Sequence, residues 1–145
     1  MGSDVKIGLE KCATILKSNG DMVRLRKKFQ FFLIIIKPEF GCSTSNIYSH
    51  IKKFSKSKLN FKNKLSFSDF LIFHNDLEAV AFKKYPKLAK LKKTVESLDN
   101  IEFARMTGSG STIVGYFSNK KDALNGTKIL KKKFKNYWCI LSKTI

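Results

Sequence analysis

Residues 101–117 read IEFARMTGSGSTIVGYF and hold the clearest strand and turn signals of the sequence. The first part of this stretch, IEFARMT, and the segment TIVGYFS at 112–118 are short and rich in β-branched or aromatic residues, which is typical of strands. The GSGS between them is a turn that only small residues could make, because glycine tolerates backbone conformations that other residues avoid. We therefore expect two consecutive strands joined by a tight turn.

Three further segments extend this pair into a sheet. The run FQFFLIIIK at 29–37 is β-branched and aromatic and stops at Pro38, which predicts a buried central strand. Residues 119–134 show the amphipathic pattern of a helix, and residues 136–145 read as a last strand.

The region between these strands is predicted to be mainly helical. A polar cluster at 43–45 supplies N-cap hydroxyls ahead of apolar residues that continue at helical spacing to Phe54. Residues 68–86 and 86–98 give two more helices, because their apolar residues repeat every three or four positions. The stretch 55–64, rich in Lys, Ser and Asn, is expected to be a mobile connection.

From Phe29 onward the predicted order is strand, helices, strand, strand, helix, strand. This is the split βαβ arrangement of a ferredoxin-like α+β sandwich, in which helices cover one face of a four-stranded antiparallel sheet. Upstream, residues 12–26 hold two short apolar segments around Asn19 and Gly20, a dipeptide that suits a tight turn. They predict a separate β-hairpin.

The composition fits one globular domain. The chain has 145 residues, of which 43% are hydrophobic, which is enough to bury a core. The longest apolar run, residues 31–36, is far shorter than the ~20 residues of a membrane-spanning helix. The N-terminus lacks the apolar segment of a secretory signal, so a cytoplasmic location is expected. The spacing of Cys12, Cys42 and Cys139 supports neither a metal site nor a disulfide framework.

The charge is strongly basic, with 29 Lys and Arg against 11 Asp and Glu and a net charge of +18. Such a balance is common in nucleic-acid binders. However, the only arginines are Arg24, Arg26 and Arg105, and phosphate-clamping or base-reading surfaces favour arginine. A solvated lysine-rich surface is therefore preferred. A ferredoxin-like RNA-binding module and a non-catalytic interaction domain stay as alternatives, although the two strands around GSGS lack the aromatic-rich pattern of RNA-binding sheets.

The GSGS turn is the candidate site. Gly108, Ser109 and Gly110 allow successive backbone N–H groups to converge on an anion, but a plain hairpin link has the same composition. The turn lacks the lysine of a Walker loop and does not open a helix, so it is not a P-loop.

Four motifs in this chain resemble those of the GHMP kinase superfamily, and in particular its members that phosphorylate diphosphocytidyl methylerythritol. In chain order they are GSDV at 2–5, IIIKPEFGCSTSNIY at 34–48, HNDLE at 74–78 and ARMTGSGSTIVGYF at 104–117. Lys6 stands where the family has Pro, and Ser45 where Pro often follows Ser-Thr.

The resemblance covers only the C-terminal half of such an enzyme. The lysine motif and the glycine-rich phosphate loop of the family's first half do not occur in this sequence. The resemblance therefore implies that residues 1–28 are a remnant of the N-terminal domain and that residues 29–145 are the C-terminal domain. Whether a separate chain supplies the missing half is left open by the sequence.

The resemblance also implies an activity: ATP-dependent phosphorylation of the 2-hydroxyl of the small-molecule substrate diphosphocytidyl methylerythritol, with ATP as co-substrate together with Mg. It implies that Asp4 is the catalytic base. Thr44 and Tyr48 would contact the substrate, with the Tyr48 ring on the cytosine. The residues that would support the phosphate loop are Gly108, Ser109, Gly110 and Ser111. No membrane and no specific nucleic acid is expected as a partner.

Each of these roles has a structural alternative. Asp4 could be a helix N-cap, and Tyr48 could be a helix aromatic that covers the sheet. Asp76 and Glu78 are expected to cap and start a helix. The two histidines, His50 and His74, have no partner pattern and are assigned no chemistry.

Overall fold

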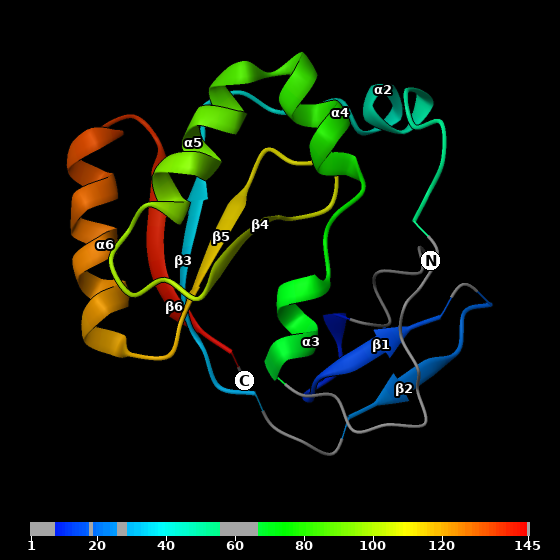
Figure 1. Ribbon diagram of the computed structural model, residues 1–145, viewed down its shortest axis with the longest axis horizontal. Helices are drawn as coiled ribbons and strands as arrows, with labels where there is room; N and C mark the ends of the chain where they lie inside the picture. Colours follow the sequence, from blue (N-terminus) through cyan, green and yellow to red (C-terminus); the bar gives the residue numbers. More distant parts are fainter. Residues whose placement is uncertain (1–7, 18, 26–28, 56–66, 145) are drawn as a thin grey trace.

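A four-stranded antiparallel sheet with strand order β4-β5-β3-β6 organises the molecule (Figure 1). The computed structural model describes residues 8–17, 19–25, 29–55 and 67–144. The strands of the sheet are β3 (Phe32–Lys37), β4 (Phe103–Met106), β5 (Ile113–Phe117) and β6 (Trp138–Lys143). This order is that of a ferredoxin-like sheet, so the predicted fold class is confirmed.

The central position of β3 confirms the prediction for the apolar run. Ile34 lies opposite Gly115 of β5 on one side and Leu141 of β6 on the other. The strand begins at Phe32, later than expected, because the chain before it is held by a side chain. The backbone N–H of Phe31 donates to the Thr144 hydroxyl (2.9 Å), which itself donates to the Phe29 carbonyl (2.8 Å).

Two helices cover one face of this sheet. Helix α5 (Pro86–Glu96) lies over β4 and β5, and α6 (Lys120–Lys133) lies over β3 and β6. Both were expected from their periodicity. The core between helices and sheet is fully buried, and its largest side chains include Ile34, Ile36, Leu88, Leu91, Ile113, Phe117 and Leu130. The helices of the described ranges have at most 14 residues, too few to span a bilayer.

The opposite face of the sheet carries a short helix and a hairpin. Strands β1 (Thr14–Leu16) and β2 (Met22–Arg24) form the predicted antiparallel hairpin, with Gly20 at a φ of 87°. Helix α3 (Phe67–Ile72) lies beside it, and its Phe70 ring packs against Phe31 at 6.1 Å between centroids. The expectation that helices lie on one face therefore holds for α5 and α6 but not for α3.

The single helix expected at 68–86 is wrong, because the chain forms α3 and then α4 (Leu77–Lys84) with a break between them. The reason is a tertiary contact. The Arg105 guanidinium donates to the carbonyls of Phe73 (2.7 Å) and Leu71 (3.1 Å). A continuous helix would need these carbonyls for its own hydrogen bonds, so α3 ends here.

The helix after the polar cluster is also shorter than expected. Helix α2 (Thr44–Ser49) stops well before Phe54. The Ser49 hydroxyl donates to the Asn46 carbonyl (2.9 Å), and His50 Nδ1 lies 2.7 Å from the same oxygen. Side chains thus occupy the acceptor that the next helical N–H would need. The expected connection at 55–64 lies, apart from its first residue, outside the described residues.

Candidate functional site

The site is built on the loop between β4 and β5. Two hydrogen bonds close this loop: Thr107 N–H donates to the Thr112 carbonyl (3.0 Å), and Gly110 N–H donates to the Thr107 carbonyl (2.9 Å). Gly108 and Gly110 have φ angles of 48° and 92°, in the left-handed region that favours glycine. The loop is therefore tightly folded, as its sequence predicts.

Gly110 also has no room for a side chain. A Cβ at this position would lie 2.9 Å from the Met106 sulfur and 3.0 Å from the Cys42 sulfur. Glycine is thus required here both by conformation and by space. The loop packs directly on the segment that precedes α2.

Two hydroxyl contacts join the loop to that segment and to the first residue of α2. Thr44 Oγ1 lies 2.9 Å from Ser109 Oγ, a hydrogen bond between residues far apart in the sequence. The Ser111 hydroxyl donates to the Phe40 carbonyl at 2.6 Å, so the hydrogen of this buried side chain is already used. The structure therefore brings together Thr44 and the glycine loop, two of the site elements singled out from the sequence.

Tyr48 lies on the same helix as Thr44. Ser43 caps this helix, its hydroxyl accepting from Asn46 N–H at 3.4 Å. Thr44 and Tyr48 are one turn apart, so they project from the same side of α2. The Tyr48 side chain is 51% exposed, which argues against the alternative that its ring covers the sheet. It is available to stack on a ligand.

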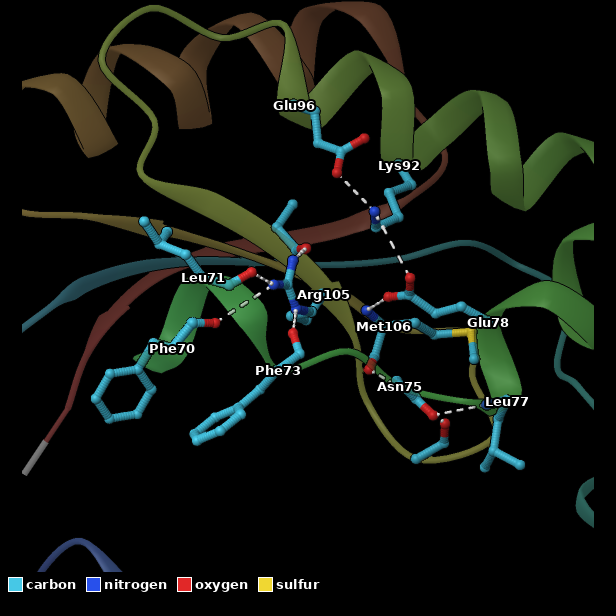
Figure 2. A network of polar contacts seen from close by, with 12 residues as sticks. Phe70, Leu71, Phe73, Asn75, Leu77, Glu78, Lys92, Glu96, Arg105 and Met106 are labelled. Atoms are coloured by element: carbon cyan, nitrogen blue, oxygen red, sulfur yellow. Dashed lines mark hydrogen bonds and ion pairs between the residues drawn. The ribbon is translucent and has the colours of Figure 1, made fainter. Parts of the chain in front are cut away.

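The HNDLE segment holds the loop from the other side (Figure 2). The Asn75 side-chain amide donates to the Met106 carbonyl (2.9 Å) and to the Gly108 carbonyl (2.7 Å). Its oxygen accepts from the N–H of Leu77, the first residue of α4, at 3.0 Å. One side chain therefore caps a helix and grips the loop.

Glu78 adds a second attachment. Its carboxylate accepts from Met106 N–H at 2.7 Å and lies 3.6 Å from the Lys92 ammonium of α5. Lys92 also pairs with Glu96 at 2.6 Å. Glu78 lies in the first turn of α4 as expected, but its contact with β4 was not predicted from the sequence.

Asp76 occupies the N-cap position of α4 but makes no capping hydrogen bond, so the expected capping role is wrong for this side chain. Asn75 takes that role instead. Asp76 accepts from the backbone N–H of Ser55 (2.8 Å) and from its hydroxyl, and these bonds hold the pKa of the Asp76 carboxyl below its ordinary value. His74 Nε2 lies 3.0 Å from the same carboxylate.

The loop retains unused donors. Within the described residues, the backbone N–H groups of Gly108 and Ser109 make no hydrogen bond. Free successive N–H groups next to a left-handed residue are a common setting for binding an anion such as phosphate. The arrangement can therefore donate hydrogen bonds to a phosphate.

The other predicted features are placed as follows. Asp4 lies outside the described residues. No group of three metal-ligating side chains occurs in residues 8–17, 19–25, 29–55 and 67–144. Cys12, Cys42 and Cys139 are free thiols, and burial raises the pKa of Cys42 and of Cys139.

A cavity of about 600 Å³ lies on the sheet face away from α5 and α6. It is bordered by residues that flank the hairpin strands, by α3 and by Asn75. Arg105 lines it as well, with its guanidinium committed to backbone carbonyls. The aromatic rings that line the cavity are Phe29, Phe31, Phe70, Phe73, Phe103 and Tyr116.

Comparison with known proteins gives a consistent result. The family model for the C-terminal region of GHMP kinases matches residues 59–136, more than half of the chain. The 4-diphosphocytidyl-2-C-methyl-D-erythritol kinase of Pelagibacter ubique is 46% identical over 147 aligned positions, which cover 100% of this chain and 52% of that protein. The protein of the same name from Thermodesulfovibrio yellowstonii is 30% identical and is covered to 54%. The chain thus spans about half the length of these curated relatives.

Solved structures agree on the fold. A crystal structure of 4-(cytidine 5'-diphospho)-2C-methyl-D-erythritol kinase superposes with a TM-score of 0.64 at 18% identity, covering 83% of this chain and 45% of that one. The homoserine kinase of Cytophaga hutchinsonii gives a TM-score of 0.63 at 14% identity, with coverages of 91% and 47%. From the family match, the relatives and the shared fold, we conclude that this chain belongs to the GHMP kinases and carries the C-terminal region of that family.

Proposed function

We propose that this chain is the C-terminal part of a 4-diphosphocytidyl-2-C-methyl-D-erythritol kinase. The reaction would transfer the γ-phosphate of ATP to the 2-hydroxyl of the diphosphocytidyl substrate, a step of isoprenoid precursor synthesis. In this proposal residues 29–145 are the C-terminal domain and residues 1–28 a remnant of the N-terminal domain. The proposal is supported by the sequence identity to curated relatives of that name, whose alignments cover the whole of this chain.

The observation that carries the proposal is the contact between Thr44 and Ser109 beside the glycine loop. It joins two segments that each resemble a motif of the same kinase family. Phosphoryl transfer depends mainly on positioning and on neutralising charge, so a loop with free N–H groups beside a hydroxyl is suited to hold the transferred group. We propose that Gly108, Ser109 and Gly110 face the phosphates, while Ser111 anchors the loop.

The acceptor substrate would lie along α2. Thr44 is placed to contact it, and the exposed Tyr48 ring is placed to stack on the cytosine. We propose that Asp4 accepts the proton of the attacking hydroxyl, as its position in the GSDV motif implies. ATP would enter with Mg bound to its phosphates, because Mg²⁺ at kinase sites is commonly held by the substrate phosphates.

The isolated chain is expected not to turn over ATP. The γ-phosphate must be surrounded by donors and a cation at the moment of transfer, and the lysine motif and glycine-rich loop of the family are absent from this sequence. We propose that these elements are supplied by an N-terminal half, on a separate chain or on a longer form of this one. The RNA-binding alternative gains nothing from the relatives, which are named as kinases.

The test is to combine this chain with the N-terminal half of the Pelagibacter ubique relative and to follow ADP formation with the diphosphocytidyl substrate. Asp4→Asn should reduce kcat by several orders of magnitude with little change in KM. Tyr48→Ala should raise KM for the diphosphocytidyl substrate, because it removes ~1–3 kcal/mol of stacking free energy. Trp138→Ala, which removes an equally exposed ring from β6, is the matched control and should change neither.

Turnover by the 145-residue chain alone would contradict the proposal. So would a reconstituted Asp4→Asn enzyme with a normal rate, or equal effects of Tyr48→Ala and Trp138→Ala on KM.

A further inference from the structure

The Asn75 side chain uses both of its donor hydrogens and its oxygen at the junction of α4 and the glycine loop. Its two amide hydrogens go to the carbonyls of Met106 and Gly108, and its oxygen takes the N–H of Leu77 (Figure 2). A residue that only capped α4 would need the oxygen alone. The two donated bonds therefore serve the loop.

These bonds determine where the loop directs its own donors. In a trans peptide the C=O and the N–H point in opposite directions. The Gly108 carbonyl is drawn to Asn75, so the N–H of Ser109, which belongs to the same peptide, points away from α4. The Met106 carbonyl is held in the same way, and the N–H of Thr107 across that peptide reaches the Thr112 carbonyl.

The Ser109 side chain is fixed from the opposite direction. Its hydroxyl lies 2.9 Å from Thr44 Oγ1 at the start of α2. The peptide between Gly108 and Ser109 is thus bound to Asn75 at the start of α4, and the Ser109 hydroxyl is bound to Thr44 of α2. Ser109 N–H is left without a partner among the described residues, on the side of the loop away from Asn75.

We propose that Asn75 is a positioning residue that aims the Ser109 N–H at the bound phosphate. It acts through the loop backbone and does not touch the substrate. The phosphate in this statement rests on the proposed function, whereas the control of the loop by Asn75 does not.

The first experiment separates the two jobs of Asn75. Asn75→Asp keeps an oxygen to cap α4, since aspartate is as good a cap as asparagine, but it replaces both donors by an oxygen facing two carbonyls. Asn75→Ser keeps a capping oxygen without adding charge and is too short to span both carbonyls. Asn119→Asp is the matched control, because Asn119 caps α6 through its oxygen, which accepts from Lys121 N–H at 2.7 Å.

The readout is amide hydrogen exchange in the isolated 145-residue chain. Asn75→Asp and Asn75→Ser should speed exchange at Thr107 and Gly110 by at least about tenfold relative to Asn119→Asp, with protection in α5 and α6 unchanged. Exchange at these two amides equal to that of the control would overturn the proposal, and so would a uniform loss of protection across the chain.

The second readout is kinetic and uses the chain combined with an N-terminal half. Asn75→Asp should lower kcat by about tenfold or more and leave KM for the alcohol substrate unchanged, because the misdirected N–H is needed for the transferring phosphate and not for substrate capture. An altered loop with unchanged kcat would overturn the link to catalysis. If the unsubstituted combined enzyme is inactive, the proposed function fails, and the exchange result still decides whether Asn75 controls the loop.

Discussion

The two faces of the sheet carry different kinds of side chain. On the face covered by α5 and α6, aliphatic side chains and Phe117 are packed to zero exposure, and a Cβ on Gly115 would lie 2.9 Å from Val95. On the other face, Phe103 and Tyr116 stack at 4.3 Å between centroids and border a cavity of about 600 Å³. One face is filled by helices, and the other is lined by rings that leave space.

The difference predicts where the stability of this domain resides. Residues of the helix-covered face pack with side chains of α5 and α6 into one buried core. Residues of the aromatic face meet a hairpin, a short helix and a loop, including Asn75 of the site. Substitutions on the first face should therefore cost more stability than the same substitutions on the second.

The largest effect is expected from two neighbours on β5 that point to opposite faces. Phe117→Ala should cost about 3–5 kcal/mol of unfolding free energy, because it leaves a void in a close-packed core. Tyr116→Ala should cost about 1–2 kcal/mol, because its ring already borders open space. Urea unfolding of both variants measures the difference, and equal losses would show that the two faces contribute alike.

Added volume gives the reverse comparison. Gly115→Ala should destabilise the chain by about 1–3 kcal/mol, since the new methyl group overlaps Val95 and Ile101. Ala13→Val adds volume beside the cavity and should change the unfolding free energy by less than about 0.5 kcal/mol. Thermal unfolding of the pair is the measurement. A stable Gly115→Ala variant would mean that the helix-covered face can relax.

The smallest effect concerns the titration of Tyr116. Burial raises the pKa of the Tyr116 phenol above its ordinary value of 10.0, and the nearby Arg105 charge offsets this only in part. Because the folded chain favours the neutral phenol, this stabilisation is complete below the pKa of the unfolded chain and is lost as the pH rises through the folded pKa. Ultraviolet titration of the native chain minus that of Tyr116→Phe should show one phenol ionising above pH 10. A difference curve centred at or below pH 10 would indicate that the aromatic face is open to water.

Much of the fold could be predicted because its information is local. The apolar run before Pro38, the Asn19-Gly20 turn and the periodicity of α5 and α6 each specify an element without reference to the rest of the chain. The break between α3 and α4 could not be predicted in this way. It depends on Arg105, which is more than thirty residues away and withdraws the carbonyls that would have continued the helix.

The candidate site divides along the same line. The resemblance pointed to Thr44 as a substrate contact and to Gly108–Ser111 as support for the phosphate loop, and the structure places Thr44 in contact with the loop. The roles of Asn75 and Glu78 were missed, because a side chain bonded to a distant backbone leaves no periodic trace in the sequence. A signal was present in HNDLE, where an asparagine stands two residues before the first residue of a helix.

The hydrogen bonds of the Thr144 side chain with Phe29 and Phe31 have a consequence for how the chain folds during synthesis. Phe31 and Thr144 are 113 positions apart in the sequence, and β3 pairs with β6 along its whole length. During synthesis the most apolar strand therefore leaves the ribosome long before one of its two neighbours exists. Pairing over such separations closes slowly and exposes the strand meanwhile. Newly made chains should thus be most prone to aggregate, and most dependent on chaperones, before β6 has emerged.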